Sequence, residues 1–239
     1  MPHVLNLWRQ QLGKVPELVW QRTELQVLIL ADNALTDLPP EIGRLHRLTT
    51  LDLGHNHLTS LPDELGDLTA LDGCLYLHDN VLPELPDALR NLTRLRYLNV
   101  GENTLTALPD VIVRMAALIE LRAQHNRLTT LPDGVGALAN LRELWLRGNE
   151  IAHLPSSMAD LHELRHLDLR ENSLAQLPDA LADLPRLRQI DLRSNRLTLL
   201  PDWVLDMPSL EKLDLRWNEC VPSAALLTEL ERRGCVVLR

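Results

Sequence analysis

The chain has 239 residues, 45% hydrophobic and 24% charged, a balance typical of a globular protein with an aliphatic core. Its formal net charge of −9 disfavours nucleic acid and anionic membranes as partners, because both select for clustered Lys and Arg. Three cysteines without close spacing do not indicate a disulfide framework, and neither a signal peptide nor a membrane-spanning run is recognisable. We therefore expect a cytoplasmic protein.

Asparagine recurs along the chain at a nearly constant interval. It occupies Asn33, Asn56, Asn80, Asn103, Asn126, Asn149, Asn172, Asn195 and Asn218, always 23 residues apart except for the 24 residues from Asn56 to Asn80. The surrounding residues repeat too, as in the segment from Leu187 to Pro201. Counting from the first Leu of each repeat, the Asn is position 9 and the Pro position 15. A fixed period of this length indicates a solenoid of stacked repeats.

The pattern L-x-x-L-x-L-x-x-N-x-L-x-x-L-P resembles the leucine-rich-repeat family over essentially the whole chain. The 23-residue length is similar to the Ras-group repeats of intracellular signalling scaffolds and to repeat regions of bacterial effectors. The resemblance implies an α/β fold: a curved solenoid with one long parallel sheet on its concave face and short helices or irregular turns on its convex face. It also implies that the nine Asn side chains form a buried ladder that satisfies backbone groups of the turns.

In chain order, we expect a single domain over residues 1–239. Residues 1–24 form a degenerate opening repeat and residues 25–218 the regular repeats, in which positions 3 to 7 alternate outward and inward as a strand does. An extra residue between Leu71 and Leu75 predicts a bulge. Residues 219–239 are expected to cap the stack with a helix and a last strand. In that strand Val236 and Leu238 fall 23 residues after the inward-pointing Leu213 and Leu215.

Positions 3, 5, 7 and 8 face outward on the sheet, and their occupants in the middle repeats are candidates for partner binding. Aromatic and Arg side chains on a rigid surface are the usual anchors of interfaces, and the chain has only seven aromatic residues. The predicted partner-binding residues are Tyr76, His78, Tyr97, Asn99, Arg122, Gln124, Trp145 and Arg147.

The C-terminal repeats present a different surface, in which two rows of charge run side by side. Position 7 is occupied by Arg147, Arg170, Arg193, Arg216 and Arg239, and position 5 by Asp168, Asp191 and Asp214. Opposite charges on neighbouring rows offset the repulsion within each row. The rows are therefore either a self-neutralising ladder or a docking strip for an acidic partner, and the sequence does not decide which surface binds.

Metal-binding and catalytic arrangements can be drawn on the same face, but both lack necessary parts. Position 8 runs through Asp32, His55, Asp79, Glu102 and His125, which are ligand types for a divalent metal, yet the row is linear and open to solvent. A Ser–His–Asp arrangement can be drawn from His166, Asp168, Asp191 and Ser194 on adjacent strands, but it lacks the pocket and oxyanion donors that acyl transfer needs. We expect no metal, no cofactor and no catalytic residue.

These features predict a monomeric, non-catalytic scaffold that binds a protein partner on the concave face. Two alternatives remain open. One is a bacterial effector that binds a host protein and has lost lysines, since only Lys14 and Lys212 are present, to escape ubiquitination. The other is a specificity subunit for a separate enzyme.

Overall fold

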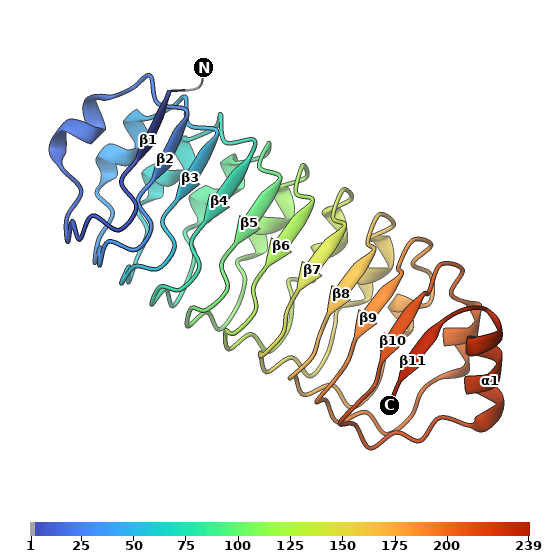
Figure 1. Ribbon diagram of the computed structural model, residues 1–239. Helices are drawn as coiled ribbons and strands as arrows, with labels where there is room; N and C mark the ends of the chain where they lie inside the picture. The colour runs from blue at the N-terminus through green and yellow to red at the C-terminus, as the bar shows by residue number, and fades with distance from the viewer. Residues whose placement is uncertain (1–2) are drawn as a thin grey trace.

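The computed structural model describes residues 3–239, and in this range eleven short parallel strands form one sheet in the order of the sequence (Figure 1). The strands are β1 (Val4–Asn6), β2 (Val27–Ile29), β3 (Thr50–Asp52), β4 (Cys74–Tyr76), β5 (Tyr97–Asn99), β6 (Glu120–Arg122), β7 (Glu143–Trp145), β8 (His166–Asp168), β9 (Gln189–Asp191), β10 (Lys212–Asp214) and β11 (Val236–Leu238). Each repeat returns the chain to the next strand, so the molecule is an elongated stack whose strands share one face, called here the sheet face.

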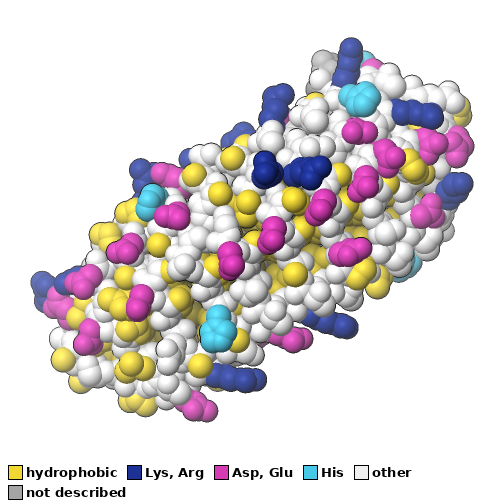
Figure 2. Space-filling view, turned by 180° about the vertical axis from the view of Figure 1, so that it is seen from behind, with side chains coloured by type: hydrophobic (Ala, Val, Ile, Leu, Met, Phe, Trp, Pro, Cys, Tyr) yellow, Lys and Arg dark blue, Asp and Glu magenta, His cyan; other side chains and the backbone are white. Residues whose placement is uncertain are grey.

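The opposite face is built from short 3-10 helices, followed at the C-terminus by one α-helix. They are η1 (Glu17–Gln21), η2 (Pro40–Arg44), η3 (Asp63–Asp67), η4 (Asp87–Asn91), η5 (Asp110–Arg114), η6 (Val135–Ala137), η7 (Ser156–Asp160), η8 (Asp179–Leu181), η9 (Asp202–Asp206) and α1 (Ala224–Arg232). Five of the 3-10 helices begin at the Asp that follows the repeat's Pro. Figure 2 shows acidic side chains spaced along this face. None of the helices described is long and apolar enough to cross a membrane.

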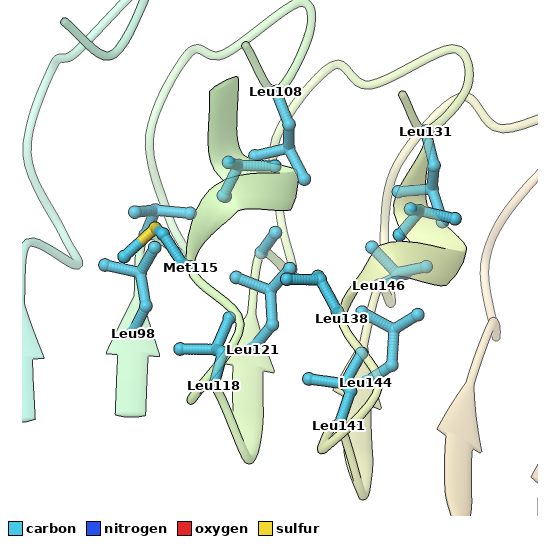
Figure 3. Close-up of a cluster of buried hydrophobic side chains, with 14 of the residues drawn as sticks. Leu98, Leu108, Met115, Leu118, Leu121, Leu131, Leu138, Leu141, Leu144 and Leu146 are labelled. Carbon is cyan, nitrogen blue, oxygen red and sulfur yellow. The ribbon is translucent and has the colours of Figure 1, made fainter. Parts of the chain in front are cut away.

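The core is a column of aliphatic side chains between the sheet and the 3-10 helices. The middle residue of a strand points inward, and Leu98, Leu121 and Leu144 are fully buried. They pack against residues from the later part of each repeat, such as Met115 and Leu138 (Figure 3). Burying one such side chain contributes about 1.5–3 kcal/mol. No single repeat encloses its own leucines, so stacking creates the core.

The repeating Asn side chains lie inside the turns that follow the strands. The amide nitrogen of Asn126 donates to the carbonyls of Val100, Ala123 and Gln124 at 3.0, 3.2 and 3.3 Å, and its oxygen accepts from the Leu105 N–H at 3.0 Å. Each Asn thus satisfies backbone groups of its own repeat and of the preceding one. Asn218, in the last regular repeat, makes the same kind of bonds but is only half-buried.

The extra residue of the third repeat is absorbed before its strand begins. The Gly73 N–H donates to the Thr49 carbonyl at 3.0 Å, and β3 and β4 pair from Leu51 opposite Leu75 onward. Tyr76 is therefore in register with its neighbours, opposite Asp52 on one side and Asn99 on the other. The expected irregularity shortens this pairing and leaves the outward rows aligned.

The register expected for the last strand is wrong by one residue. Lys212 pairs with Val236 and Leu213 with Val237, so Val237 packs against the core, while Val236 is 55% exposed. The connection contains the nine-residue helix α1 in place of a 3-10 turn, and it is one residue longer than a regular repeat. A shift of one residue exchanges the two faces of a strand. Arg239 consequently does not continue the position 7 row of arginines.

Candidate protein-binding site on the sheet face

Four of the predicted partner-binding residues are brought together by strand register. Tyr76, Asn99, Arg122 and Trp145 occupy the same outward position on β4 to β7, each opposite the next. Tyr97 lies two residues before Asn99 on β5 and faces the same side. Strand spacing of about 4.8 Å places neighbouring outward side chains within contact distance.

The aromatic rings and the guanidinium of this region form a continuous row, which we call the aromatic row (Tyr76, Tyr97, Arg122 and Trp145). The ring centres of Tyr76 and Tyr97 are 5.0 Å apart with a tilt of 47°. The Arg122 guanidinium carbon lies 5.8 Å from the centre of the Tyr97 ring and 5.0 Å from that of the Trp145 ring. The row therefore crosses four strands without interruption.

Acidic side chains bind the polar groups of Arg122 and Trp145. The Arg122 guanidinium donates to the Glu120 carboxylate, and the Trp145 indole nitrogen donates to Glu143 at 3.2 Å. Burial raises the pKa of the Tyr76 and Tyr97 hydroxyls, so both phenols stay neutral to higher pH than a free tyrosine does. The surface thus presents aromatic faces bordered by two carboxylates.

The sequence-based prediction did not include Glu120, Glu143 or His166 among the binding residues. The imidazole of His166, on β8, lies 4.2 Å from the Trp145 ring and extends the row by one strand. All three occupy the outward position two residues before the one shared by Arg122 and Trp145. Their common place in the repeat, on the outward side of the strand, is the feature of the sequence from which they can be found.

The other predicted residues are placed nearby but bind other groups. Asn99 is 7% exposed, and its oxygen accepts from the Gly101 N–H at 3.1 Å, so it stabilises the turn. Arg147 binds the Glu171 carboxylate of the next repeat at 2.8 Å. Gln124 lies across Gly101, where a Cβ atom would approach its amide to 2.6 Å. These side chains border the aromatic row without joining it.

His78 pairs with His55, with ring centres 4.7 Å apart, and its ring centre also lies 6.0 Å from that of Tyr76 in the aromatic row. Its ring lies over Gly54, where a Cβ atom would come within 2.4 Å of it. Its Nε2 is 3.2 Å from the His55 Nε2, and the His55 Nδ1 is 2.6 Å from the Asp79 carboxylate. Burial and the charge of His55 lower the pKa of His78. Within residues 3–239 no three His, Cys, Asp or Glu side chains are arranged to hold a metal ion.

The charged rows of the C-terminal repeats pair with each other, and we call this arrangement the Asp–Arg ladder. Arg193 contacts Asp191 at 2.6 Å and Asp214 at 3.4 Å, and Arg216 contacts Asp214 at 2.7 Å. Arg170 likewise contacts Asp168 at 3.2 Å. The two outer aspartates, Asp168 and Asp214, are 2% exposed. This geometry corresponds to the self-neutralising interpretation of the two rows.

Two family models match the sequence. A leucine-rich repeat region covers residues 133–232, and a model of two leucine-rich repeat copies covers residues 23–70. The chain is a leucine-rich-repeat protein. Repeats of this family generally mediate protein–protein interaction, and proteins built from them are typically non-catalytic scaffolds.

Solved structures of the same fold resemble this leucine-rich-repeat protein along most of its length. A leucine-rich-repeat protein of Leptospira interrogans is 28% identical with a TM-score of 0.80, and the match covers 96% of this chain and 70% of that one. The ectodomain of the plant receptor kinase GASSHO1/SCHENGEN3 from Arabidopsis thaliana, in complex with CASPARIAN STRIP INTEGRITY FACTOR 2, is 30% identical with a TM-score of 0.79. That match covers 94% of this chain and 28% of the receptor chain.

An internalin of Listeria monocytogenes shares the fold at 22% identity, with a TM-score of 0.72 and coverage of 92% of this chain and 68% of that one. No protein of curated function is significantly similar in sequence.

Proposed function

We propose that this leucine-rich-repeat protein is a monomeric, non-catalytic scaffold that binds a partner protein through the aromatic row of its sheet face. The observation that supports this most is the continuous contact from Tyr76 to Trp145 across four strands. In a chain with seven aromatic residues, three of them gather, half-buried, at one place on the sheet face.

The row has the properties of an interface anchor. Its side chains stack on one another and are held by Glu120 and Glu143, so little conformational entropy is lost when a partner binds. Aromatic and Arg residues dominate the binding energy of most protein interfaces. Three strand intervals give the row a length of about 14 Å, which suits a helix or an extended segment laid across the sheet.

The solved relatives support this kind of function without identifying the partner. The Arabidopsis receptor ectodomain is described in complex with CASPARIAN STRIP INTEGRITY FACTOR 2, although this chain spans only 28% of that receptor chain. The free cysteines Cys74, Cys220 and Cys235 suit a reducing compartment, and our proposal therefore places the protein in the cytoplasm.

The test is affinity capture with the intact chain as bait, read by quantitative mass spectrometry. A Tyr97→Ala/Trp145→Ala double variant removes two anchors, and a Trp8→Ala/Trp217→Ala variant is the matched control, because both of its tryptophans are exposed near the ends of the stack. We expect a protein that is retained by the wild type and by the control and lost by the first variant. A set of captured proteins identical for all three baits would refute the proposal.

A further inference from the structure

A second row of arginines lies outside the sheet face, at the edge where the strands begin. Arg96, Ile119, Arg142, Arg165 and Arg188 occupy the residue just before β5 to β9. Of these five residues, each of the last four donates its backbone N–H to the carbonyl of the residue at the same position in the preceding repeat, at 2.8, 2.8, 2.8 and 3.0 Å. Arg94 and Arg186 lie two residues earlier in the first and last of these repeats. We call the six arginines the edge row.

The positive charge of the edge row is only partly compensated. Arg94 contacts Asp72, Arg165 and Arg186 share Glu163, and Arg188 contacts Glu211. Arg96 and Arg142 have no carboxylate within ion-pair distance in the part of the chain that the structure describes. Six positive charges therefore face three negative ones in a chain whose net charge is −9.

This imbalance contrasts with the Asp–Arg ladder, in which each arginine contacts an aspartate. Like charges on neighbouring strands destabilise a sheet, and the arginine side chains of the edge row are all exposed. The fold gains no core packing from them. Binding of an acidic partner therefore explains the presence of these arginines better than a contribution to the stability of the fold does.

Two hollows lie along this edge. One, of about 340 Å³, is lined by the arginines Arg94, Arg96 and Arg142, by Asp72, which contacts Arg94, and by Thr93 and Asn140, and Ala117 and Ile119 contribute apolar surface to it. The other, of about 220 Å³, is lined by Arg165, Arg186, Arg188 and Ser209. The edge thus offers cationic side chains along its length and one apolar place between Arg96 and Arg142.

We infer that the edge row is a docking surface for an acidic amphipathic helix of a partner protein. Successive strands repeat about every 4.8 Å, and a helix presents one residue per turn on the same side, about every 5.4 Å. In an extended peptide, side chains on one side recur only about every 6.6 Å, so they fall out of step with the roughly 4.8 Å spacing of the strands sooner than those of a helix do. From β5 to β9 the row spans about 19 Å, the length of roughly 13 helical residues. An apolar side chain of the helix fits the hollow beside Ile119.

The experiment uses a fluorescent, alanine-based peptide of 18 residues with glutamates along one helical face and a central Leu. A second peptide has the same composition with the glutamates distributed around the helix. Binding to the full chain is measured by fluorescence anisotropy at low and at moderate salt. The variant Arg142→Glu/Arg165→Glu tests the edge row. Arg90→Glu/Arg114→Glu is the control, because both arginines are exposed in η4 and η5 on the opposite face.

We expect the one-faced peptide to bind the wild type in a salt-dependent way. The edge variant should bind at least about tenfold more weakly, and the control within about twofold of the wild type. The distributed peptide should also bind more weakly, and Tyr97→Ala/Trp145→Ala should leave peptide binding unchanged, which separates this surface from the aromatic row. Four outcomes would each overturn the inference. They are an absence of peptide binding by the wild type, equal losses of binding in both charge variants, equal binding of both peptides, and tighter binding of a single-stranded oligothymidylate that depends on the edge row.

Discussion

The guanidinium carbon of Arg122 lies over the ring of Trp145 on the adjacent strand, 5.0 Å from its centre, and the two residues are opposite each other in the sheet register. A cation beside an aromatic ring is stabilised by the ring's quadrupole, by about 0.5–1 kcal/mol at an exposed site. The contact orients both side chains before any partner arrives. The proposed binding surface is therefore preorganised.

The first prediction concerns affinity for the purified partner. Tyr97→Ala/Trp145→Ala should weaken binding by at least about 2 kcal/mol, the scale of an interface hot spot, as measured by isothermal titration calorimetry. The melting temperature should change little, because both side chains lie on the surface. Trp8→Ala/Trp217→Ala should bind as the wild type does. Unchanged binding by the first variant would mean that the partner uses another surface.

The second prediction concerns the buried Asn side chains. Asn126→Leu leaves the N–H of Leu105 without a partner and removes one of two donors from the carbonyls of Val100 and Ala123, which still accept from Asn103 and Asn149. We expect the free energy of unfolding in urea to fall by about 2–4 kcal/mol, since the unpaired N–H costs about 1–3 kcal/mol and each further lost hydrogen bond about 0.5–1.5 kcal/mol. Asn91→Leu, at an exposed position of η4, is the control and should change it by less than about 0.5 kcal/mol. Equal losses in both variants would contradict a special role for Asn126.

The third prediction compares two arginines of one repeat. Arg193 binds Asp191 and the buried Asp214, whereas Arg188 is exposed at the edge and lies 3.6 Å from Glu211. Arg193→Met should lower the free energy of unfolding by about 1–3 kcal/mol, and Arg188→Met by less than about 0.5 kcal/mol. An equally small effect of both substitutions would contradict a stabilising role of the Asp–Arg ladder.

Arg193 also controls the ionisation of Asp191. Burial opposes the charged carboxylate, but hydrogen bonds from Arg193 outweigh it and hold the pKa of Asp191 below its ordinary value. The stabilisation is therefore present above the pKa of the unfolded chain and is lost as pH falls through the folded pKa. In Arg193→Met the pKa of Asp191 should rise, and carboxyl NMR titration measures it.

The fourth prediction concerns pH and His78. Burial, and then the charge of His55, lower its pKa below the ordinary 6.5, while Asp52, Glu102 and Asp79 act in the opposite direction. The folded state thus favours the neutral imidazole. Its contribution to stability is complete above pH 6.5 and declines as pH falls through the folded pKa. His55→Ala removes the like charge and should raise the pKa of His78 in an NMR titration; an unchanged or lower value would exclude His55 as a cause.

The periodic sequence by itself determined the architecture. A 23-residue period with Leu at fixed positions leaves few ways to bury those side chains other than stacking, so the strands, the inward leucines such as Leu121 and the placement of Asn126 inside a turn follow from spacing. The outward position of Tyr76, Arg122 and Trp145 follows from the same alternation. These features depend on backbone register, which the repeat imposes.

The tertiary structure alone decided which exposed groups bind one another. Whether an arginine binds an aspartate of its own strand, as Arg193 does, or a glutamate of the next repeat, as Arg147 does, depends on side-chain directions across neighbouring repeats. The one-residue shift of β11 depended on how many residues α1 uses, which a period cannot specify where the repeat ends. The unbalanced charge of the edge row likewise depends on which carboxylates the arginines reach. An ion pair is set by the distance between two side chains in space and not by their spacing in the sequence.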